Sequence, residues 1–164
     1  MPTADATGAP IRRSVLVIGG TGILAPAARA LAEAGATTTA GGRGGRAAPT
    51  DVELLVMDGR VGFEADGRRW DQAIVYLPAV TAQTLTLVRE AVSSRLVEVR
   101  PSAAADPARG DFALEADVLQ LGWAEEGGER RWHSPDEVSA AALQVLADGD
   151  GRVLGRVRPW GDRL

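Results

Sequence analysis

One stretch decides the fold of this chain: Ser14-Val15-Leu16-Val17-Ile18-Gly19-Gly20-Thr21-Gly22-Ile23-Leu24-Ala25. Its aliphatic run at residues 15–18 predicts a strand that is covered on both faces. A glycine turn follows, and the apolar periodicity after it predicts a helix over residues 23–34. A buried strand, a glycine turn and a helix in this order are typical of a parallel α/β sheet that binds a ligand at the turn.

The glycine turn keeps the spacing G-x-x-G-x-x-A through Gly19, Gly22 and Ala25. Gly19 lets the chain reverse, Gly22 leaves room for a pyrophosphate, and Ala25 permits close packing of helix on strand. The first N–H groups of the helix face the phosphates, although Pro26 removes one donor. A tight turn that binds nothing is the alternative, and a P-loop is a poor fit because the chain has no lysine. The residues predicted to hold the diphosphate of a dinucleotide are Gly19, Thr21, Gly22, Ile23 and Leu24.

The composition limits the class of protein. A chain of 164 residues suits one globular domain, which we place at residues 13–164 after a flexible tail at 1–12. The net charge of −4 argues against nucleic acid or an anionic membrane as a partner. The absence of cysteine and the single histidine argue against disulfides, zinc fingers and a histidine-based metal site, so we predict no metal. No apolar run is long enough to span a membrane and no signal peptide is evident, so we expect a cytoplasmic protein.

The second predicted strand covers residues 37–40, and the loop after it indicates which dinucleotide the protein binds. In a dinucleotide fold this strand ends beside the adenosine ribose, where an acidic residue would bind the 2′-hydroxyl of NAD. No acid occurs between positions 36 and 50, whereas Arg43 and Arg46 offer guanidinium groups to a 2′-phosphate. We therefore predict NADP(H) as the cofactor; a solvated loop without a ligand is the alternative.

The rest of the chain continues the alternation of strands and helices. Further strands are predicted at residues 51–57, 72–77, 96–99, 117–123 and 153–157. Further helices are predicted at 81–94 and 134–147, and the second begins with the capping box Ser134-Pro135-Asp136-Glu137. Residues 59–71 favour a small hairpin or an irregular excursion, with Trp70 as a packing anchor, and residues 125–131 favour a turn. The pattern predicts an α/β fold, a doubly wound parallel sheet in a truncated Rossmann-like three-layer sandwich.

With these residues placed, the chain resembles the short-chain dehydrogenase/reductase family. Residues 15–46 look like the family's cofactor end, and residues 132–155 look like its last helix and strand. The run Ser-Ala-Ala-Ala-Asp-Pro at 102–107 and the closing Pro159-Trp160 are similar to a group of compact family members. The resemblance implies a reductase fold with NADP(H), but it brings no assigned reaction.

The chain departs from the family at its catalytic residues. The family uses a serine just beyond the fifth strand and a Tyr-x-x-x-Lys pair on a long helix. Ser102 falls at the serine position, but lysine is absent and the only tyrosine is Tyr76, one strand earlier. Residues 103–116 leave no room for the long helix. The usual proton relay therefore cannot operate, because no lysine lowers the pKa of the tyrosine.

Two residues are predicted to be catalytic. Ser102 could hydrogen-bond a substrate carbonyl, and Tyr76 could act as a general acid; turn capping and core packing are the respective alternatives. Asp58 could bind the adenine amine or cap a turn. Leu77 and Pro78 complete the predicted cofactor residues at the end of the fourth strand. For three further residues, His133, Asp106 and Asp111, we predict a structural role in preference to a catalytic one.

Together these features predict an NADP(H)-dependent reductase of short-chain type, which transfers hydride to a C=N, C=C or C=O group of a small organic substrate, for example in a bacterial biosynthetic pathway. The alternative is a non-redox NADP(H)-binding protein, a sensor or scaffold, or a cyclase or lyase on the same fold. The expected partner is a small-molecule substrate, and a homodimer could form through the helix at 81–94 or through the final strand.

Overall fold

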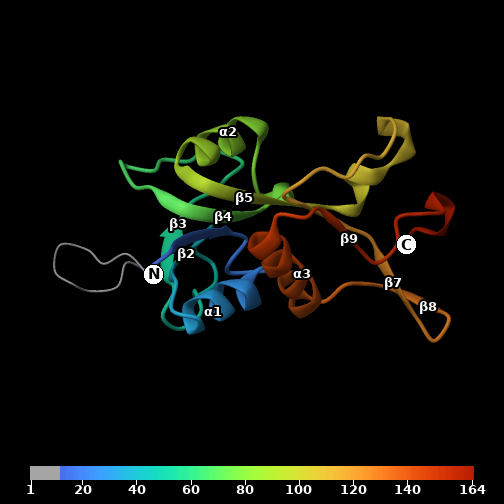
Figure 1. Cartoon of the computed structure of the whole chain (residues 1–164), viewed down its shortest axis with the longest axis horizontal. Coiled ribbons are helices and arrows are strands. Elements are labelled where there is room, and N and C mark those ends of the chain that lie inside the picture. Colours follow the sequence, from blue (N-terminus) through green and yellow to red (C-terminus); the bar gives the residue numbers. More distant parts are fainter. Residues whose placement is uncertain (1–11) are drawn as a thin grey trace.

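A computed structural model describes residues 12–164 (Figure 1), so the first eleven residues of the predicted tail lie outside the described residues. The main sheet contains β1 (Ser14–Ile18), β2 (Thr37–Gly42), β3 (Glu53–Val56), β4 (Trp70–Tyr76), β5 (Val92–Arg100), β6 (Val118–Leu121) and β9 (Arg152–Leu154). A separate hairpin contains β7 (Trp123–Glu126) and β8 (Glu129–Trp132). The helices are α1 (Ala25–Glu33), α2 (Ala82–Glu90) and α3 (Pro135–Asp148), with short 3₁₀ turns η1 (Leu77–Ala79), η2 (Ser102–Ala105), η3 (Pro107–Arg109) and η4 (Trp160–Asp162).

The strands of the main sheet are all parallel, in the order β3-β2-β1-β4-β5-β6-β9. β1 pairs with β2 on one side and with β4 on the other, so the chain reverses its direction of travel across the sheet beside β1. Helices α1 and α3 cover one face and α2 covers the other (Figure 1). The predicted doubly wound α/β fold is confirmed, and all strands end at the same edge of the sheet.

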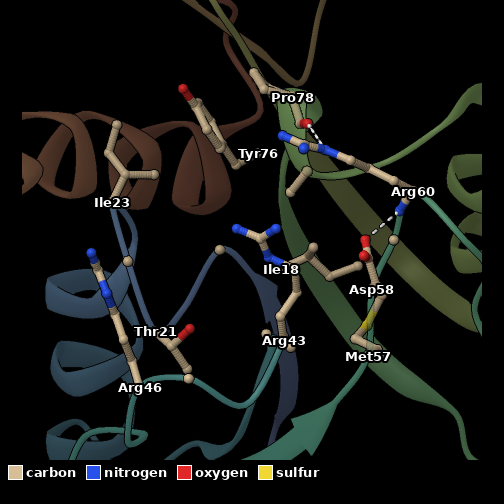
Figure 2. A pocket seen from close by; sticks show the side chains of 17 residues that line it. Ile18, Thr21, Ile23, Arg43, Arg46, Met57, Asp58, Arg60, Tyr76 and Pro78 are labelled. Carbon is tan, nitrogen blue, oxygen red and sulfur yellow. Dashed lines mark hydrogen bonds between the residues drawn. The ribbon is translucent and has the colours of Figure 1, made fainter.

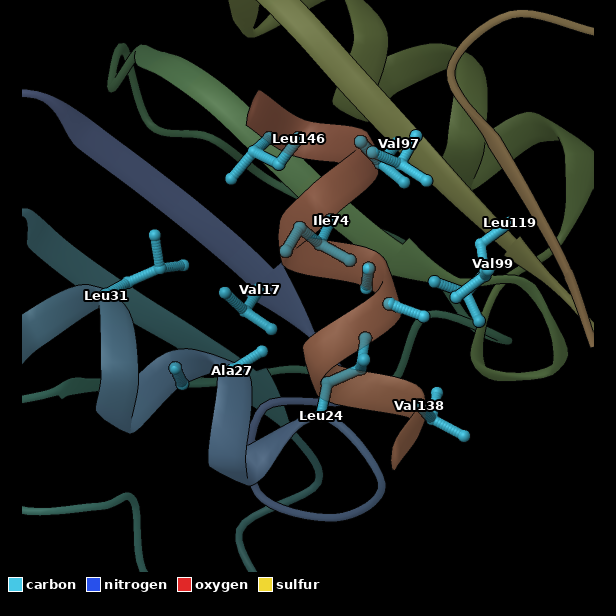
Figure 3. Packing of buried hydrophobic residues seen from close by; sticks show 14 of the residues in the cluster. Val17, Leu24, Ala27, Leu31, Ile74, Val97, Val99, Leu119, Val138 and Leu146 are labelled. Atoms are coloured by element: carbon cyan, nitrogen blue, oxygen red, sulfur yellow. The ribbon is translucent and has the colours of Figure 1, made fainter. Parts of the chain in front are cut away.

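The core between the sheet and helices α1 and α3 fixes the start of α1 (Figure 3). Val17 and Ile74 from the sheet pack in one cluster with Leu31 of α1 and Leu146 of α3. Burial of an aliphatic side chain of this size contributes about 1.5–3 kcal/mol. Leu24, which precedes α1, is fully buried in the same cluster. The first turn of α1 is therefore held against the carboxyl end of β1.

The other face of the sheet carries the irregular segment before β4. Residues 59–69 form turns and no helix, as the sequence predicts. Trp70 is buried, its indole Nε1 donates to Thr39 Oγ1 at 3.2 Å, and its ring lies 6.1 Å from that of Phe63. Arg68 lies over the same ring and pairs with Glu53. The role of Trp70 as a packing anchor is thus confirmed.

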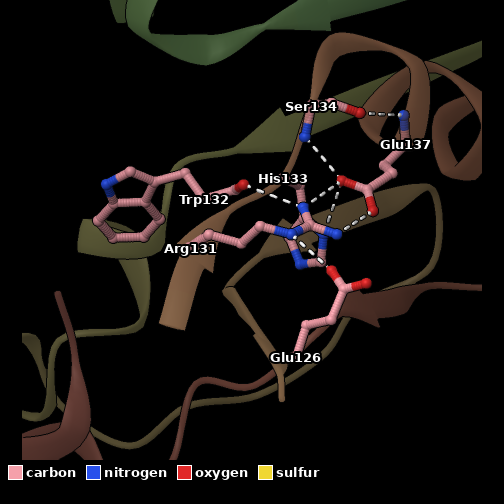
Figure 4. A network of polar contacts seen from close by, with 6 residues as sticks. All are labelled: Glu126, Arg131, Trp132, His133, Ser134 and Glu137. Atoms are coloured by element: carbon pink, nitrogen blue, oxygen red, sulfur yellow. Dashed lines mark hydrogen bonds and ion pairs between the residues drawn. The ribbon is translucent and has the colours of Figure 1, made fainter. Parts of the chain in front are cut away.

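Helix α3 begins where the capping box predicts. Ser134 Oγ accepts from the Glu137 amide at 3.3 Å, and Glu137 Oε2 accepts from the Ser134 amide at 2.7 Å. Figure 4 shows that Arg131 of β8 also binds Glu137, at 2.8 Å, so the same carboxylate ties the hairpin to the helix. Gly149 ends α3 in the left-handed conformation, with φ of 75°.

Several predicted element boundaries were wrong because strand pairing overrides local propensity. Residues 92–94, which were expected in a helix, belong to β5, because Val92 pairs with Trp70 of β4. Residues 125–131, expected as a turn, form most of the β7–β8 hairpin around Gly127 and Gly128. β2 runs two residues further than predicted, whereas β3 and β9 are shorter. No helix in residues 12–164 has the length and apolar character that crossing a bilayer requires.

Candidate functional site

A cavity of about 660 Å³ lies at the carboxyl ends of β1, β2, β3 and β4 (Figure 2). This is the switch point of a doubly wound sheet, where ligands of such folds bind. The cavity brings together residues that are widely separated in the sequence. Its lining residues are Ile18, Gly19, Thr21, Gly22, Ile23, Gly41, Gly42, Arg43, Gly45, Arg46, Met57, Asp58, Gly59, Arg60, Tyr76, Pro78 and Ala79.

The glycine turn presents backbone donors to this cavity. Gly19 has φ of 99°, and its carbonyl accepts from the amides of Gly22 and Leu24, both at 3.0 Å. Among the described residues, the amides of Thr21 and Ile23 have no hydrogen-bond partner. Backbone N–H groups that converge beside a helix start form a binding site for an anion such as a phosphate. Leu24, in contrast, uses its amide within the turn and its side chain in the core, and it does not line the cavity.

Only one glycine of the turn is not required for packing. A Cβ on Gly20 would lie 2.8 Å from Ala40 Cβ, and a Cβ on Gly19 would lie 3.1 Å from Tyr76 Cβ. At Gly22 a Cβ would make only ordinary contacts, 3.8 Å from the Gly19 carbonyl oxygen and 3.9 Å from Arg46 Nη1. The fold therefore leaves the space above Gly22 open, next to the backbone donors of the turn.

The side-chain charge around the cavity is positive. Arg43, Arg46 and Arg60 line it, and no carboxylate of the described residues lies within ion-pair distance of their guanidinium groups. Arg43 and Arg46 both extend into it from the loop after β2 (Figure 2). The structure separates their positions: Arg43 directly follows the last residue of β2, whereas Arg46 lies beside Gly22.

Arg60 is a lining residue that the sequence reasoning missed. Its Nε donates to the Pro78 carbonyl at 3.3 Å, and its amide donates to Asp58 Oδ1 at 3.0 Å. Asp58 therefore caps a turn through one oxygen while it lines the cavity. A basic residue directly after the Asp-Gly pair that ends a parallel strand was the signal available in the sequence. Leu77 lies in η1 and packs against the apolar cluster on the α2 face, and it does not line the cavity.

Tyr76 lies in the cavity, and Ser102 does not. Tyr76 ends β4 and lines the cavity, where burial raises the pKa of its phenol. Ser102 is only 9% exposed, and its Oγ accepts a long hydrogen bond of 3.4 Å from Arg163 Nε. Tyr76 of β4 pairs with Val99 of β5 in the sheet. Ser102 therefore lies three residues beyond this pair, in the segment that follows β5. The structure does not bring the two predicted catalytic residues into one cavity.

The remaining polar candidates have structural positions. The side chain of His133 is 8% exposed, and its Nδ1 lies 3.5 Å from Glu137 Oε2 at the start of α3 (Figure 4). Asp106 Oδ1 caps η3 by accepting from the Ala108 amide at 2.9 Å, and Asp111 is exposed. Within residues 12–164, no group of His, Asp and Glu side chains is arranged to hold a metal ion.

Solved structures with the same fold are found among short-chain dehydrogenases. A short chain dehydrogenase/reductase family protein superposes with a TM-score of 0.56 at 15% identity, over 87% of this chain and 94% of its own. The oxidoreductase ylbE from Lactococcus lactis gives a TM-score of 0.55 at 12% identity, over 85% and 88%. A wide-type short-chain dehydrogenase/reductase from Veillonella parvula, in complex with NADP, gives 0.51 at 13% identity, over 85% and 89%.

At these identities the likeness establishes the fold. No protein-family model matches the sequence, and no curated protein matches it significantly. The chain thus has a Rossmann-like fold similar to that of short-chain dehydrogenases/reductases. The predicted fold resemblance is confirmed.

Proposed function

We propose that this protein is an NADP(H)-dependent reductase of short-chain type, acting on a C=N, C=C or C=O group of a small organic substrate. The observation that carries the proposal is the cavity at the switch point. It combines the unpartnered amides of Thr21 and Ile23, the open space above Gly22 and a positive side-chain charge. The likeness in fold to one solved structure that holds NADP supports the same proposal.

Three parts of the dinucleotide, the diphosphate, the 2′-phosphate and the adenine, would find matching groups in the cavity. The amides of Thr21 and Ile23 would hold the diphosphate, with Arg46 beside them as a counter-charge. Arg43, directly after β2, would bind the 2′-phosphate, because a guanidinium group matches phosphate geometry. The oxygen of Asp58 that does not cap the turn is available to the adenine amine.

The cofactor would supply hydride, and the chain would position and polarise the acceptor. Tyr76 is protonated at neutral pH, as a tyrosine ordinarily is, and burial raises its pKa further, so it can donate a hydrogen bond but is a weak acid. Ser102, whose Oγ contacts the cationic Arg163 but which does not line the cavity, would polarise the substrate oxygen or nitrogen from the segment that follows β5. Water or Tyr76 would deliver the proton.

One observation favours a second function, an NADP(H)-binding protein without redox activity. The chain has no lysine, and its only tyrosine lies in β4 instead of on a long helix after β5. η2 and η3 occupy the place of that helix. A sensor, a scaffold, or a cyclase or lyase would need the nucleotide cavity but not the missing pair.

Calorimetric titration with NADPH and NADH tests the proposal. Arg43→Ala should weaken NADPH binding by roughly 1.5–3 kcal/mol and leave NADH nearly unchanged. Arg69→Ala is the matched control, because Arg69 is exposed and lies outside the cavity. If the wild-type protein binds neither nucleotide, the proposal fails. Oxidation of NADPH in the presence of imines, enones or carbonyl compounds then separates the two functions, because the non-redox protein binds NADPH without turnover.

A further inference from the structure

A ladder of arginines and aromatic rings stands at the end of the molecule beyond β6 and β9. Arg158 lies 6.0 Å from the ring centre of Phe112 and 5.8 Å from that of Trp160. Arg163 lies 5.0 Å from Trp160 and 6.0 Å from Trp132. Figure 1 shows why these residues meet: η3, the β7–β8 hairpin and the C-terminal residues gather at one end of the chain. We call the five side chains the Arg–aromatic ladder.

The ladder holds two positive charges that have no carboxylate partner. Neither Arg158 nor Arg163 lies within ion-pair distance of a carboxylate of the described residues. Arg158 donates instead to the carbonyl oxygens of Ala105 and Val157, at 2.9 and 2.8 Å. Both guanidinium groups lie beside the same Trp160 ring, so two positive charges without an acidic counter-charge among the described residues stand at one aromatic side chain. A bound anion would supply that counter-charge.

The ladder also offers flat apolar surface. Trp132 is a large aromatic residue that is 48% exposed, next to Arg163. A guanidinium group next to an aromatic ring can still bind a planar carboxylate through its edge, and in Arg163 only Nε donates to another of the described residues, to Ser102 Oγ. The rings themselves can stack with a flat part of the same ligand. The combination therefore fits a carboxylate that is attached to an aromatic or conjugated group.

The ladder reaches the serine that the sequence analysis predicted as catalytic. Arg163 Nε donates to Ser102 Oγ at 3.4 Å, and Ser102 follows β5 at the same sheet edge as the nucleotide cavity. A ligand carboxylate held by Arg163 would thus bring its conjugated group near Ser102. In the nucleotide cavity, Arg43 and Arg46 are the arginines proposed to bind the cofactor, whereas Arg158 and Arg163 do not line it.

We propose that the Arg–aromatic ladder is the substrate-recognition site, and that the substrate is a small carboxylate with an aromatic or conjugated group. That this ligand is the substrate rests on the proposed reductase function, whereas the anion site itself does not depend on that function. Arg163 is the principal binding residue, with Arg158 as the second charge and Trp132 and Trp160 as stacking surfaces.

Magnetic resonance of the isotope-labelled protein tests the site directly. The chain contains four tryptophans, of which Trp132 and Trp160 belong to the ladder, Trp123 is the buried cross-strand partner of Trp132, and Trp70 is buried against the opposite part of the sheet. Titration with benzoate should shift the indole N–H signals of the two ladder tryptophans and leave that of the remote Trp70 in place. Benzamide, which has the same ring without the charge, should produce no saturable shift.

Variants identify the residue that binds. Arg163→Gln should weaken benzoate at least about tenfold, the loss of one charge-assisted contact, and Arg163→Lys should lie between it and wild type. Arg69→Gln is the control and should bind benzoate like wild type. Arg158→Gln should also weaken benzoate binding. This second variant keeps the proposal testable if Arg163→Gln disturbs the structure of the C-terminal residues. Benzoate binding that is absent, or equal in all variants, overturns the proposal; so does tighter binding of inorganic phosphate than of benzoate.

A parallel titration with NADPH keeps this test separate from the proposed function. Arg163→Gln should bind NADPH like wild type, because Arg163 does not line the nucleotide cavity. If the protein binds NADPH but not benzoate, only the ladder proposal is wrong. If it binds benzoate at the ladder but not NADPH, the reductase proposal is wrong and the anion site stands.

Discussion

Arg46 lies against Gly22: its Nη1 is 3.9 Å from the position that a Cβ would take on the glycine. Twenty-four positions separate the two residues in the sequence, yet one belongs to the turn after β1 and the other to the loop after β2, which are neighbouring strands. The contact places Arg46 beside the glycine turn, and we therefore propose that it binds the diphosphate and not the 2′-phosphate of the nucleotide.

This position leads to different expectations for the two arginines. Arg46→Ala should weaken NADPH and NADH alike, by about 1.5 kcal/mol, because both nucleotides carry the diphosphate. Arg43→Ala should weaken NADPH alone. Calorimetry with both nucleotides on both variants measures the four affinities. An Arg46→Ala protein that discriminates between the nucleotides as Arg43→Ala does would show that the two residues share the 2′-phosphate.

Gly22 should be required by the ligand and not by the fold. Its Cβ would meet only ordinary contacts, so Gly22→Ala should leave the free energy of unfolding unchanged or raise it by about 0.4–1 kcal/mol. The added methyl occupies the diphosphate space, so NADPH binding should fall at least about tenfold. Gly20→Ala is the contrast: its Cβ would press on Ala40, which should cost about 1–3 kcal/mol of stability. Urea denaturation and calorimetry on both variants decide, and normal NADPH binding by Gly22→Ala would contradict the assignment.

Tyr76 should titrate above the ordinary pKa of tyrosine. Burial penalises the phenolate, so the folded pKa is raised and the phenol stays protonated through neutral pH. Tyr76 is the only tyrosine of the chain, so the tyrosinate absorbance follows this one group. The midpoint should lie above about 10 in the folded protein and return to the ordinary value in urea. A midpoint below the ordinary value would mean that Tyr76 has a cationic partner and can serve as a stronger acid.

Glu137 should make stability depend on acid pH. Its hydrogen bond to Arg131, followed by that to the Ser134 amide, lowers the pKa of the carboxyl well below its usual range. Because the folded pKa is lower than the unfolded one, the contribution is present above about pH 4.3 and is lost as the pH falls below it. Glu137 is partly exposed, so Glu137→Gln should lower the free energy of unfolding by less than about 1 kcal/mol at neutral pH.

The comparison between neutral and acid pH isolates this charge. Near pH 3 the difference between Glu137→Gln and wild type should shrink, since the wild-type carboxyl then loses part of its advantage. Glu129→Gln on β8 is the control, because Glu129 is exposed and pairs with no arginine of the described residues. Glutamine retains the capping hydrogen bond but not the charge. A pH-independent difference would therefore show that the negative charge of Glu137 does not strengthen this hydrogen bond.

The sequence alone was sufficient for the features that depend on a few consecutive residues. The strand, turn and helix of residues 14–25 form as predicted, because the aliphatic run and Gly19 specify them locally. The capping box at Ser134 and Glu137 closes across three residues. The alternation of such units also determined the doubly wound parallel sheet, since short crossovers leave few other arrangements.

Only the tertiary structure decided which distant groups meet. The extension of β5 to Val92 depends on its pairing with Trp70, and the place of Arg60 in the cavity depends on the Pro78 carbonyl. Ser102 was predicted from a local position, but its contact with Arg163 is set by how the C-terminal residues return to β5. In each case the partner lies on another strand or loop of a parallel sheet. Such contacts form through space between separate strands and loops, and no spacing along the chain encodes them.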